Sequence, residues 1–418
     1  MTKTIYALAT LDTKGSELEF LVSELKLAIA SSGTVDDFEI QIVDVSTLNP
    51  SDSADISTAE ILQSTELPKG DRGACIAAVS TALQDWIIAQ LRRKNDLAGM
   101  IGIGGSGGTA LITSAMRAVP IGIPKVMLST MASGNTAPYV DCSDITMMYS
   151  VVDIAGLNVV SRKVLSNAAN ALAGMVLGQQ GESAEPSKPT LGMTMFGVTT
   201  PCVTLVRERM EALGFDCLVF HATGSGGRAM EKLVESGMIQ GVIDVTTTEV
   251  ADEIAGGIMP AGEQRFEATL KAEIPFVLSL GAVDMVNFGS LDSVPGEYQS
   301  RQLLSHNPQV TLMRTNTEEN QAIASWIAQK LNRSIAPVTV CVPEGGVSSL
   351  DVPQQPFYSA EIRTSLVQEL DKTLQQNSSR RLLRHSEHIN SPDFAGFLVN
   401  TFVSAWESKH GNVPKVSH

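Results

Sequence analysis

The sequence has few cysteines and comparatively few basic residues. Its five cysteines are widely spaced and include no Cys-x-x-Cys pair, which argues against a disulfide framework and against a zinc site. Lys and Arg number 30 against 45 Asp and Glu, giving a formal net charge of -15 with no dense basic tract. Such a surface repels polyphosphate backbones, so we expect no nucleic-acid partner. The cysteine usage fits a cytoplasmic protein best.

A long uninterrupted apolar segment is also lacking. The chain reaches Asp12 after a very short apolar stretch, too short for the core of a signal peptide. The uncharged stretches 97–116 and 164–181 are broken by a glycine loop and by Asn and Gln residues, so neither predicts a membrane-spanning helix. We therefore expect no membrane association. Residues 164–181 predict a helix buried on most sides, against its own domain or a second subunit, and hence a homo-oligomer.

The chain does have the length and hydrophobic content for two cores, with 418 residues of which 43% are hydrophobic. Apolar periodicity stops in the Gly-, Ser- and Pro-rich stretch 178–189, which predicts domains at 1–180 and 190–418 joined by a linker at 181–189. On both sides of the linker, continuous apolar strands alternate with helical patterns. This alternation predicts α/β architecture: two Rossmann-like, doubly wound domains with mainly parallel sheets.

Predicted strands lie at 4–11, 39–45, 125–129, 190–196, 216–221, 241–245, 276–280, 310–313 and 338–342, with a further one before the glycine loop. Predicted helices lie at 16–30, 74–93, 109–118, 228–235, 318–331 and 360–374. Ligands of such sheets bind beyond the carboxyl ends of the strands. The candidate residues described next all follow predicted strands or precede predicted helices.

The most informative motif is the glycine-rich loop 102–109, which follows an apolar run and precedes a helical pattern. Backbone amides at a helix N-terminus form a seat for phosphate, and glycines leave it open. A dinucleotide fingerprint would require an acidic residue about 20 positions later, which is missing, and a P-loop would require a lysine where Gly108 stands. We predict phosphate binding at Gly104, Gly105, Ser106 and Gly107. Close packing of strand and helix is the structural alternative.

Other polar residues of the first domain are expected at the same edge of the sheet. Asp12, Thr13 and Lys14 directly follow the first strand, where Lys14 could supply the missing positive charge and Asp12 could reach a ribose or a metal-bound water. Thr47 follows the second strand, and Arg72 precedes a long helix and could provide a guanidinium fork for phosphate. Helix caps and an exposed salt bridge are the alternative interpretations.

Together these blocks resemble the ATP-binding family related to the N-terminal inhibitor region of the tomato mosaic virus resistance protein, whose bacterial members are mostly uncharacterised. The matching blocks are residues 12–14, 43–47, 101–109, 120–125, 129–134, 150–153, 221–228 and 305–308. The resemblance implies ATP, with Mg²⁺, in the first domain and self-association into dimers. Its nucleotide contacts would be Asp12, Thr13, Lys14, Thr47, Gly104 to Gly107 and Arg72.

The plant protein also has a barrel-like C-terminal half, and we expect no counterpart of it in this chain. Inhibition of a virus is therefore not transferred to this chain. A separate barrel-fold protein remains an expected candidate partner.

The second domain repeats the strand, glycine turn and helix design in residues 221–228. His221 and Arg228 flank this turn, and Glu249, Asp284 and His306 are expected at neighbouring strand ends. Such a set could bind a small anionic substrate and transfer protons. The alternative is that the histidines are structural and that the acids cap helices. No metal ligands are assigned.

The residues, together with what the resemblance implies, predict an ATP-binding protein that acts as an enzyme on a small anionic metabolite in the cleft between the two domains. A non-catalytic, nucleotide-sensing dimer that engages a partner protein is the alternative. A nicotinamide-dependent oxidoreductase is disfavoured by the missing acidic residue. The deciding question for catalysis is whether His221 and His306 converge in space.

Overall fold

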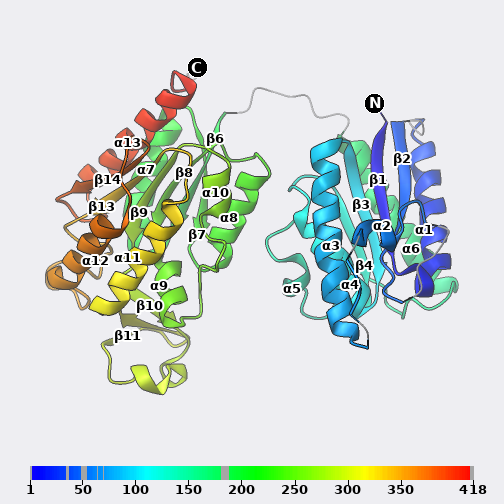
Figure 1. Cartoon of the computed structure of the whole chain (residues 1–418), viewed down its shortest axis with the longest axis horizontal. Helices are drawn as coiled ribbons and strands as arrows, with labels where there is room; N and C mark the ends of the chain where they lie inside the picture. Colours follow the sequence, from blue (N-terminus) through cyan, green and yellow to red (C-terminus); the bar gives the residue numbers. More distant parts are fainter. Residues whose placement is uncertain are drawn as a thin grey trace. The chain divides into compact units, whose positions relative to one another are not determined.

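Each half of the chain builds its own parallel β-sheet. The computed structural model describes residues 2–33, 37–48, 54–63, 65–68, 70–179 and 188–414. It divides the chain into unit 1, Met1–Glu185, and unit 2, Pro186–His418 (Figure 1). The predicted linker 181–189 lies mostly outside the described residues.

Unit 1 contains one sheet in the order β2-β1-β3-β4-β5, in which all neighbouring strands are parallel. Its strands are β1 (Lys3–Ala9), β2 (Phe38–Asp44), β3 (Leu97–Gly104), β4 (Lys125–Ser129) and β5 (Thr146–Tyr149). Its helices are α1 (Leu11–Ala30), α2 (Thr58–Leu62), α3 (Arg72–Arg93), α4 (Ser106–Ala118), α5 (Ala137–Val140) and α6 (Val159–Gly178), with a 3₁₀ turn at Thr130–Ser133.

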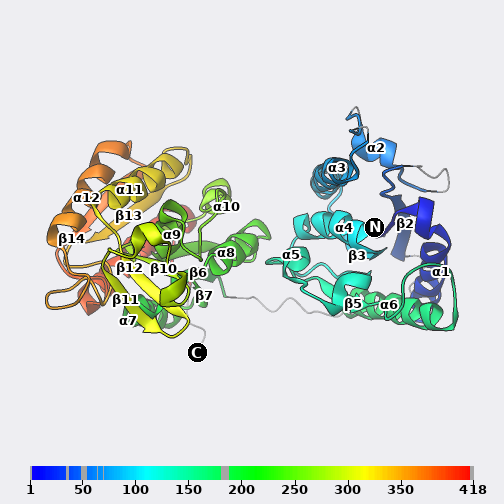
Figure 2. The same ribbon diagram turned by 90° about the horizontal axis from the view of Figure 1, so that it is seen from below.

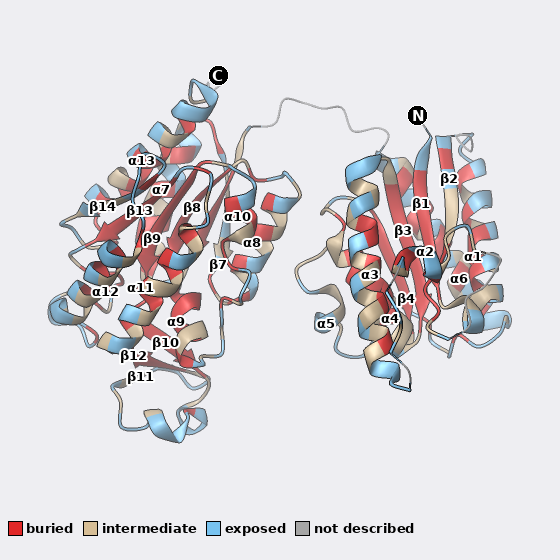
Figure 3. Cartoon of the chain, in the orientation of Figure 1, coloured by how far each residue is buried: buried red, intermediate tan, exposed pale blue. Residues whose placement is uncertain are grey.

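Alternating side chains of β1 divide unit 1 into two cores. Ile5 and Ala7 of β1 pack in one core with α1 and α6, whereas Tyr6 and Leu8 pack in the other with α3 and α4. This alternation follows from the two-residue period of a strand. Figure 2 shows the sheet between these two helical layers, and Figure 3 shows its strands as the buried centre of the unit.

Helix α3 is long and apolar enough, by length and composition alone, to cross a membrane. In unit 1 its residues Val79, Leu83 and Ile87 are buried in the core formed with α4 and the sheet. One face of α3 therefore covers the sheet of an α/β unit.

Unit 2 contains a larger parallel sheet in the order β14-β13-β9-β8-β6-β7. Its strands are β6 (Thr190–Met195), β7 (Asp216–His221), β8 (Gly241–Thr246), β9 (Phe276–Gly281), β13 (Val338–Pro343) and β14 (Arg380–His385). Its helices are α7 (Thr200–Ala212), α8 (Ser225–Glu235), α9 (Thr248–Ala255), α10 (Glu267–Lys271), α11 (Thr317–Leu331), α12 (Ala360–Thr373) and α13 (Pro392–His410). One core contains α8 to α12 and the other α7 and α13.

A small antiparallel sheet extends unit 2 beyond the end of β9. Its strands β10 (Met285–Phe288), β12 (Val310–Arg314) and β11 (Leu303–Asn307) pair in the order β10-β12-β11 (Figure 1). The sequence predicts a strand at 310–313, but it does not predict the two strands that pair with it. Both lie in short segments with weak apolar alternation.

The prediction of two Rossmann-like α/β domains with mainly parallel sheets is confirmed. In both units the first strand has the second on one side and the third on the other, and the later strands follow outward from the third. Such an order places the topological switch point between the first and third strands. These strands are β1 and β3 in unit 1, and β6 and β8 in unit 2.

Candidate functional site

The predicted nucleotide-binding segments of unit 1 meet at the carboxyl ends of adjacent strands. Leu8 pairs with Gly102 and Ala9 with Asp44, so the segments after β1, β2 and β3 leave the sheet side by side. Gly104 pairs with Ser129, which brings in the 3₁₀ turn after β4. The loops after β1 and β3 flank the switch point, where open α/β sheets bind ligands.

Two glycines of the loop are explained by packing. A Cβ on Gly102 would lie 2.5 Å from Ile112 Cγ2, and one on Gly104 would lie 2.8 Å from the backbone of Gly108 and Thr109. Both positions therefore exclude a side chain for steric reasons. The structural alternative accounts for these two residues.

The start of α4 has open space around it. A Cβ on Gly105 would have Thr130 Oγ1 as its nearest neighbour, at 3.9 Å, and one on Gly108 would meet Ile103 O at 3.8 Å. Among the described residues, no side chain caps α4 at its N-cap residue Gly105. Packing thus does not explain the glycine at 105, and the first amides of the helix lack a protein anion.

A cation lies against this helix start. Arg72 is the first residue of α3, and its Nη2 atom lies 3.8 Å from the Cβ position of Gly107. The side chain is exposed, and its guanidinium makes no hydrogen bond or ion pair within the described part of the chain. Asp71 caps α3 by accepting from Ala74 N at 3.0 Å, and this bond fixes the start of the helix at Arg72. Arg72 is therefore available to an anion at α4.

Lys14 is held differently. Its Nζ donates to the carbonyl oxygen of Ile154, in the segment after β5, at 2.5 Å. Lys14 also has non-helical φ and ψ values of -136° and 20°, a kink within α1. Of the two predicted cations, Arg72 is the one that lies beside the glycine loop, while Lys14 ties α1 to the segment after β5.

The amides at the start of α1 are already bound by protein groups. The buried Asp44 carboxylate accepts from Leu11 N at 3.1 Å and from Ser46 Oγ at 2.5 Å, and Ser46 Oγ accepts from Asp12 N at 3.1 Å. These bonds explain why α1 begins at Leu11 and not at the predicted residue 16. The side chains of Asp12 and Thr13 are exposed, and Thr47 is half-buried. They offer polar groups beside α4, but α1 offers no free anion seat.

In unit 2, the corresponding glycine turn is occupied by a carboxylate. Glu249 is fully buried and accepts from Gly224 N at 2.6 Å and from Gly227 N at 3.2 Å, both at the start of α8. Its other oxygen accepts from Arg265 Nε at 3.0 Å. The amides that would hold an anion in residues 221–228 are thus bound to Glu249.

Arg265 joins Glu249 to two further buried acids. Its guanidinium lies 2.7 Å from Asp244 Oδ2 and 3.2 Å from Glu231 Oε1. Burial raises the pKa of Glu231 and of Asp244, and Arg265 opposes both shifts. Burial alone would lower the pKa of Arg265, but the acids, Asp244 first, raise it above its usual range. The four groups form one structural network with three acids around one cation.

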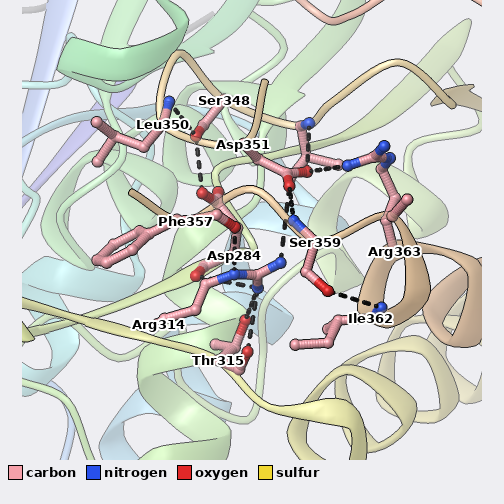
Figure 4. Close-up of polar contacts among 12 residues, drawn as sticks. Asp284, Arg314, Thr315, Ser348, Leu350, Asp351, Phe357, Ser359, Ile362 and Arg363 are labelled. Atoms are coloured by element: carbon pink, nitrogen blue, oxygen red, sulfur yellow. Dashed lines mark hydrogen bonds and ion pairs between the residues drawn. The ribbon is translucent and has the colours of Figure 1, made fainter. Parts of the chain in front are cut away.

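Asp284 belongs to a second buried network, shown in Figure 4. Its Oδ2 accepts from Ser348 Oγ at 2.8 Å, and its carbonyl oxygen accepts from Arg314 Nη1 at 3.3 Å. Asp351 accepts from Arg363 Nη1 at 2.8 Å and lies 3.7 Å from Arg314 Nη2. Burial, together with the charge of Asp351, raises the pKa of Asp284 to about 7. This network fastens the end of β9 to β12, α12 and the loop 344–359.

The carboxyl edge of unit 2 is further covered by its own loops. Val198, in the 3₁₀ turn Gly197–Thr199 after β6, has a carbonyl that accepts from Ser349 N at 3.0 Å and from Asn390 Nδ2 at 2.9 Å. Ala282 N donates to Val347 O at 2.8 Å. The segments after β13 and β14 therefore bond to the turn after β6, and the segment after β9 bonds to the one after β13.

The remaining predicted catalytic residues, His221, Arg228 and His306, are exposed. The His221 ring lies 5.4 Å from the ring of Phe196, and Phe196 packs in the same apolar cluster as Leu304 of β11. The segments of the two histidines thus reach one cluster, but no contact joins their imidazoles among the described residues. The structure groups Glu249 with Arg265, and Asp284 with Arg314, and it unites neither pair with the histidines.

No group of three or more His, Cys, Asp or Glu side chains that could hold a metal ion occurs in the described ranges. A divalent cation would therefore need ligands from a bound phosphate and water, as Mg²⁺ commonly has. Asp12 is the exposed carboxylate nearest in sequence to the end of β1.

Two protein-family models match the chain. Residues 3–181 match the N-terminal domain of the uncharacterised protein family UPF0261, and residues 188–406 match its C-terminal domain. Together they cover nearly all of the described residues.

Individual relatives match over nearly the whole chain. A UPF0261 protein of Mesorhizobium japonicum is 48% identical over 401 residues, which are 94% of this chain and 97% of that protein. The relative from Clostridium tetani is 42% identical over 409 residues, covering 97% and 100%. The ToMV resistance protein Tm-1 of Solanum lycopersicum is 46% identical over 417 residues, covering 96% of this chain but 55% of the tomato protein.

Among solved structures, a UDP-GlcNAc 2-epimerase from Methanocaldococcus jannaschii matches 90% of this chain and 94% of its own, with 8% identity and a TM-score of 0.21. This likeness is too weak to bear on fold or function. The relation to the tomato resistance protein, expected from the sequence blocks, is confirmed by the direct match.

Proposed function

This chain belongs to the uncharacterised protein family UPF0261, whose two domain models match its two units, and we propose that it binds ATP at the carboxyl edge of unit 1. The triphosphate would lie on the first amides of α4, beside the Arg72 guanidinium. Mg²⁺ would accompany the phosphates, with Asp12 positioned to contact a metal-bound water or the ribose.

One observation carries this proposal. At the switch point of unit 1, Arg72 lies beside the start of α4, with its Nη2 3.8 Å from the place that a Cβ on Gly107 would take, and among the described residues neither the helix start nor the guanidinium is bound by a side chain. Helix amides and a guanidinium are both donors that match phosphate oxygens. The open space at Gly105 leaves room for a ligand, whereas a filled turn would exclude it.

The neighbouring polar groups suit the rest of a nucleotide. Thr13 and Thr47 follow the first and second strands, at the same edge of the sheet as the start of α4. Their hydroxyls could hydrogen-bond ribose or base. Lys14 would act by holding the segment after β5 in place through Ile154 O and by adding positive charge at this edge.

The decisive test uses calorimetric titration of the whole chain with Mg²⁺-ATP. Gly105→Asp places a carboxylate at the N-cap of α4, where Asp is a favoured cap, so the variant should fold at least as stably as the parent. The same carboxylate would occupy the amides and repel phosphate. We expect ATP binding to be abolished in Gly105→Asp, weakened by about tenfold or more in Arg72→Gln, and weakened less in Lys14→Ala, because Lys14 acts through Ile154 O and not through the glycine loop.

Lys26→Ala is the matched control, because Lys26 is an exposed lysine of α1 whose side chain makes no contact with the glycine loop. Its ATP affinity should equal that of the parent. Undiminished affinity in Gly105→Asp, with its fold intact by circular dichroism, would refute the phosphate seat.

Two roles fit such a site. Turnover of ATP by the pure protein, with or without a small anionic metabolite, would support an enzyme. Binding without turnover would support a nucleotide sensor that engages a partner protein. We further propose self-association through the exposed face of α6, where Val159 is 84% and Met175 is 38% exposed, which the mass in solution by light scattering would check.

A further inference from the structure

Unit 1 contains a cavity that the nucleotide proposal does not use. It has a volume of about 290 Å³ and lies between β1, β2, α2 and the C-terminal part of α3. Arg93, the last residue of α3, lines it, whereas Arg72, the first, lies beside the glycine loop. A helix of 22 residues is about 33 Å long, so the cavity lies far from the proposed phosphate seat.

Two aromatic rings form the apolar wall of this cavity. Tyr6 of β1 and Trp86 of α3 pack edge to face, with ring centroids 5.0 Å apart and planes at 63°. The Tyr6 hydroxyl has no hydrogen-bond partner among the described residues, although the residue is only 4% exposed. Burial, with a contribution from Asp96, raises the pKa of Tyr6 to about 12, so the phenol keeps its proton and can donate it to a ligand.

The lining holds two cations against one carboxylate, in a chain whose net charge is -15, while Asp96 and Glu39 lie close enough to raise the pKa of Tyr6. Arg93 and Lys94 line the cavity at the end of α3, and both are exposed. Glu60 also lines it, but its carboxylate already accepts from Ser57 N at 2.8 Å and from Ser57 Oγ at 3.1 Å as part of the cap of α2. Its charge is therefore partly satisfied at the helix start.

Amide side chains complete the polar part of the lining. Gln41 of β2 is opposite Tyr6 in the sheet register, and its Nε2 donates to Glu39 at 2.8 Å. Gln90 Oε1 accepts from Arg93 Nη2 at 2.9 Å, which directs that guanidinium along the wall of the cavity. The lining therefore places the cations Arg93 and Lys94 beside the two aromatic rings.

We infer that this cavity binds a small planar anion, an aromatic ring bearing a carboxylate. The ring would pack against Tyr6 and Trp86, and the carboxylate would accept from Arg93, Lys94 and the Tyr6 hydroxyl. Ligand pockets in proteins begin at about 300 Å³, so this volume suits a single-ring compound and not a nucleotide.

The test uses three probes of nearly the same size on the whole chain: benzoate, benzyl alcohol and benzylamine. Calorimetry measures their affinity, and tryptophan fluorescence reports on contact with Trp86. Benzoate should bind about tenfold or more tightly than the neutral alcohol and the cationic amine, since a carboxylate gains charge-assisted hydrogen bonds. Added salt should weaken benzoate binding.

Arg93→Gln and Arg92→Gln form a matched pair, because these neighbours end the same helix and only Arg93 lines the cavity. Arg93→Gln should weaken benzoate binding about tenfold, and Arg92→Gln should leave it unchanged. Tyr6→Phe should also weaken it without altering the melting temperature greatly. The fluorescence response to benzoate should disappear in Trp86→Phe.

Three outcomes would overturn the inference: no saturable benzoate binding up to about 10 mM, equal affinity for benzoate and benzyl alcohol, or a fluorescence response that persists in Trp86→Phe. ATP affinity should be unchanged in Arg93→Gln. The result for this cavity is therefore independent of the result for the phosphate seat.

Discussion

The same four residues, Gly-Ser-Gly-Gly, begin a helix in each unit, at 105–108 in α4 and at 224–227 in α8. In unit 2 the buried Glu249 binds the amides of Gly224 and Gly227, whereas in unit 1 no side chain among the described residues caps α4. The two helix starts are alike in sequence and differ in what lies opposite them. A residue far along the chain thus decides whether such a motif is open to an anion.

The difference extends along the whole carboxyl edge. Unit 2 places acids and arginines of its own there, fully buried, and its loops after β6, β9, β13 and β14 bond to one another. Unit 1 leaves Asp12, Thr13 and Arg72 exposed at the corresponding edge. This difference supports the proposal that a ligand binds in unit 1, and we regard the charge networks of unit 2 as the means by which that unit closes its switch point.

The largest expected effect comes from breaking the network of unit 2. Arg265→Met removes the only cation that contacts Glu231, Asp244 and Glu249 among the described residues, leaving buried carboxylates without a counter-charge. We expect a loss of about 3–5 kcal/mol in the free energy of unfolding. Urea denaturation followed by fluorescence would measure it.

Arg207→Met is the control, because Arg207 and Glu211 form an exposed pair with Nε and Oε1 3.9 Å apart. Its removal should cost less than about 1 kcal/mol. Equal costs for the two substitutions would show that the Arg265 network contributes nothing specific to unit 2.

An intermediate effect should separate the two glycine turns directly. Gly227→Ala would place a Cβ 2.4 Å from Glu249 Oε2 and 2.8 Å from Arg265 Nε, whereas Gly108→Ala at the matching position would meet only Ile103 O at 3.8 Å. Gly227→Ala should lower the free energy of unfolding by about 1–3 kcal/mol through overpacking. Gly108→Ala should change it by less than about 1 kcal/mol.

Thermal denaturation of both variants against the parent provides the comparison. If Gly108→Ala were the more damaging substitution, the open helix start would have to be in unit 2 and not in unit 1. The distinction between the units would then be reversed.

The smallest expected effect is the change in the free energy of unfolding per pH unit that Asp284 causes. Its pKa is raised from 3.8 to about 7 in the folded state by burial and by Asp351, so between these values the native state holds a proton that the unfolded state has lost. The stability contributed by this proton is present below about pH 4 and is lost as the pH rises toward 7. Asp284→Asn should remove that slope, which is at most about 1.4 kcal/mol per pH unit.

Asparagine fits this site because its oxygen can still accept from Ser348 Oγ, and its amide would replace Oδ1, which has no partner among the described residues. Asp292→Asn, on the exposed turn Leu291–Ser293, is the control and should leave the slope unchanged. Denaturant titrations from about pH 4 to 7 measure both variants. A slope retained in Asp284→Asn would assign it to another group.

Much of the fold followed from local patterns in the sequence. The strand at 125–129 and the strand at 216–221 were predicted to the residue, because continuous apolar runs bounded by glycine, proline or charge have few other interpretations. The start of the helix at 360 was predicted to the residue, but several other helix starts were predicted too late. α1, α3, α4 and α8 all begin earlier than their apolar periodicity, since Asp44, Asp71 or a glycine turn supplies the first hydrogen bonds.

Strand β14 was missed for a different reason. Its sequence, Arg380–His385, is rich in arginine and lacks the continuous apolar run that predicts a strand. It lies at the edge of the sheet, where only β13 pairs with it and polar side chains can reach solvent. Such a strand depends on its neighbour and not on its own apolar character.

The sequence by itself determined that this chain forms two doubly wound α/β units and that polar residues gather at the carboxyl ends of their strands, because apolar periodicity and glycine turns act over a few neighbouring residues. Tertiary structure alone decided which of those residues remain open to a ligand. Glu249 reaches Gly224, and Arg72 reaches Gly107, only after the strands have paired. The occupancy of a helix start depends on distances between segments remote in sequence, and no local pattern encodes them.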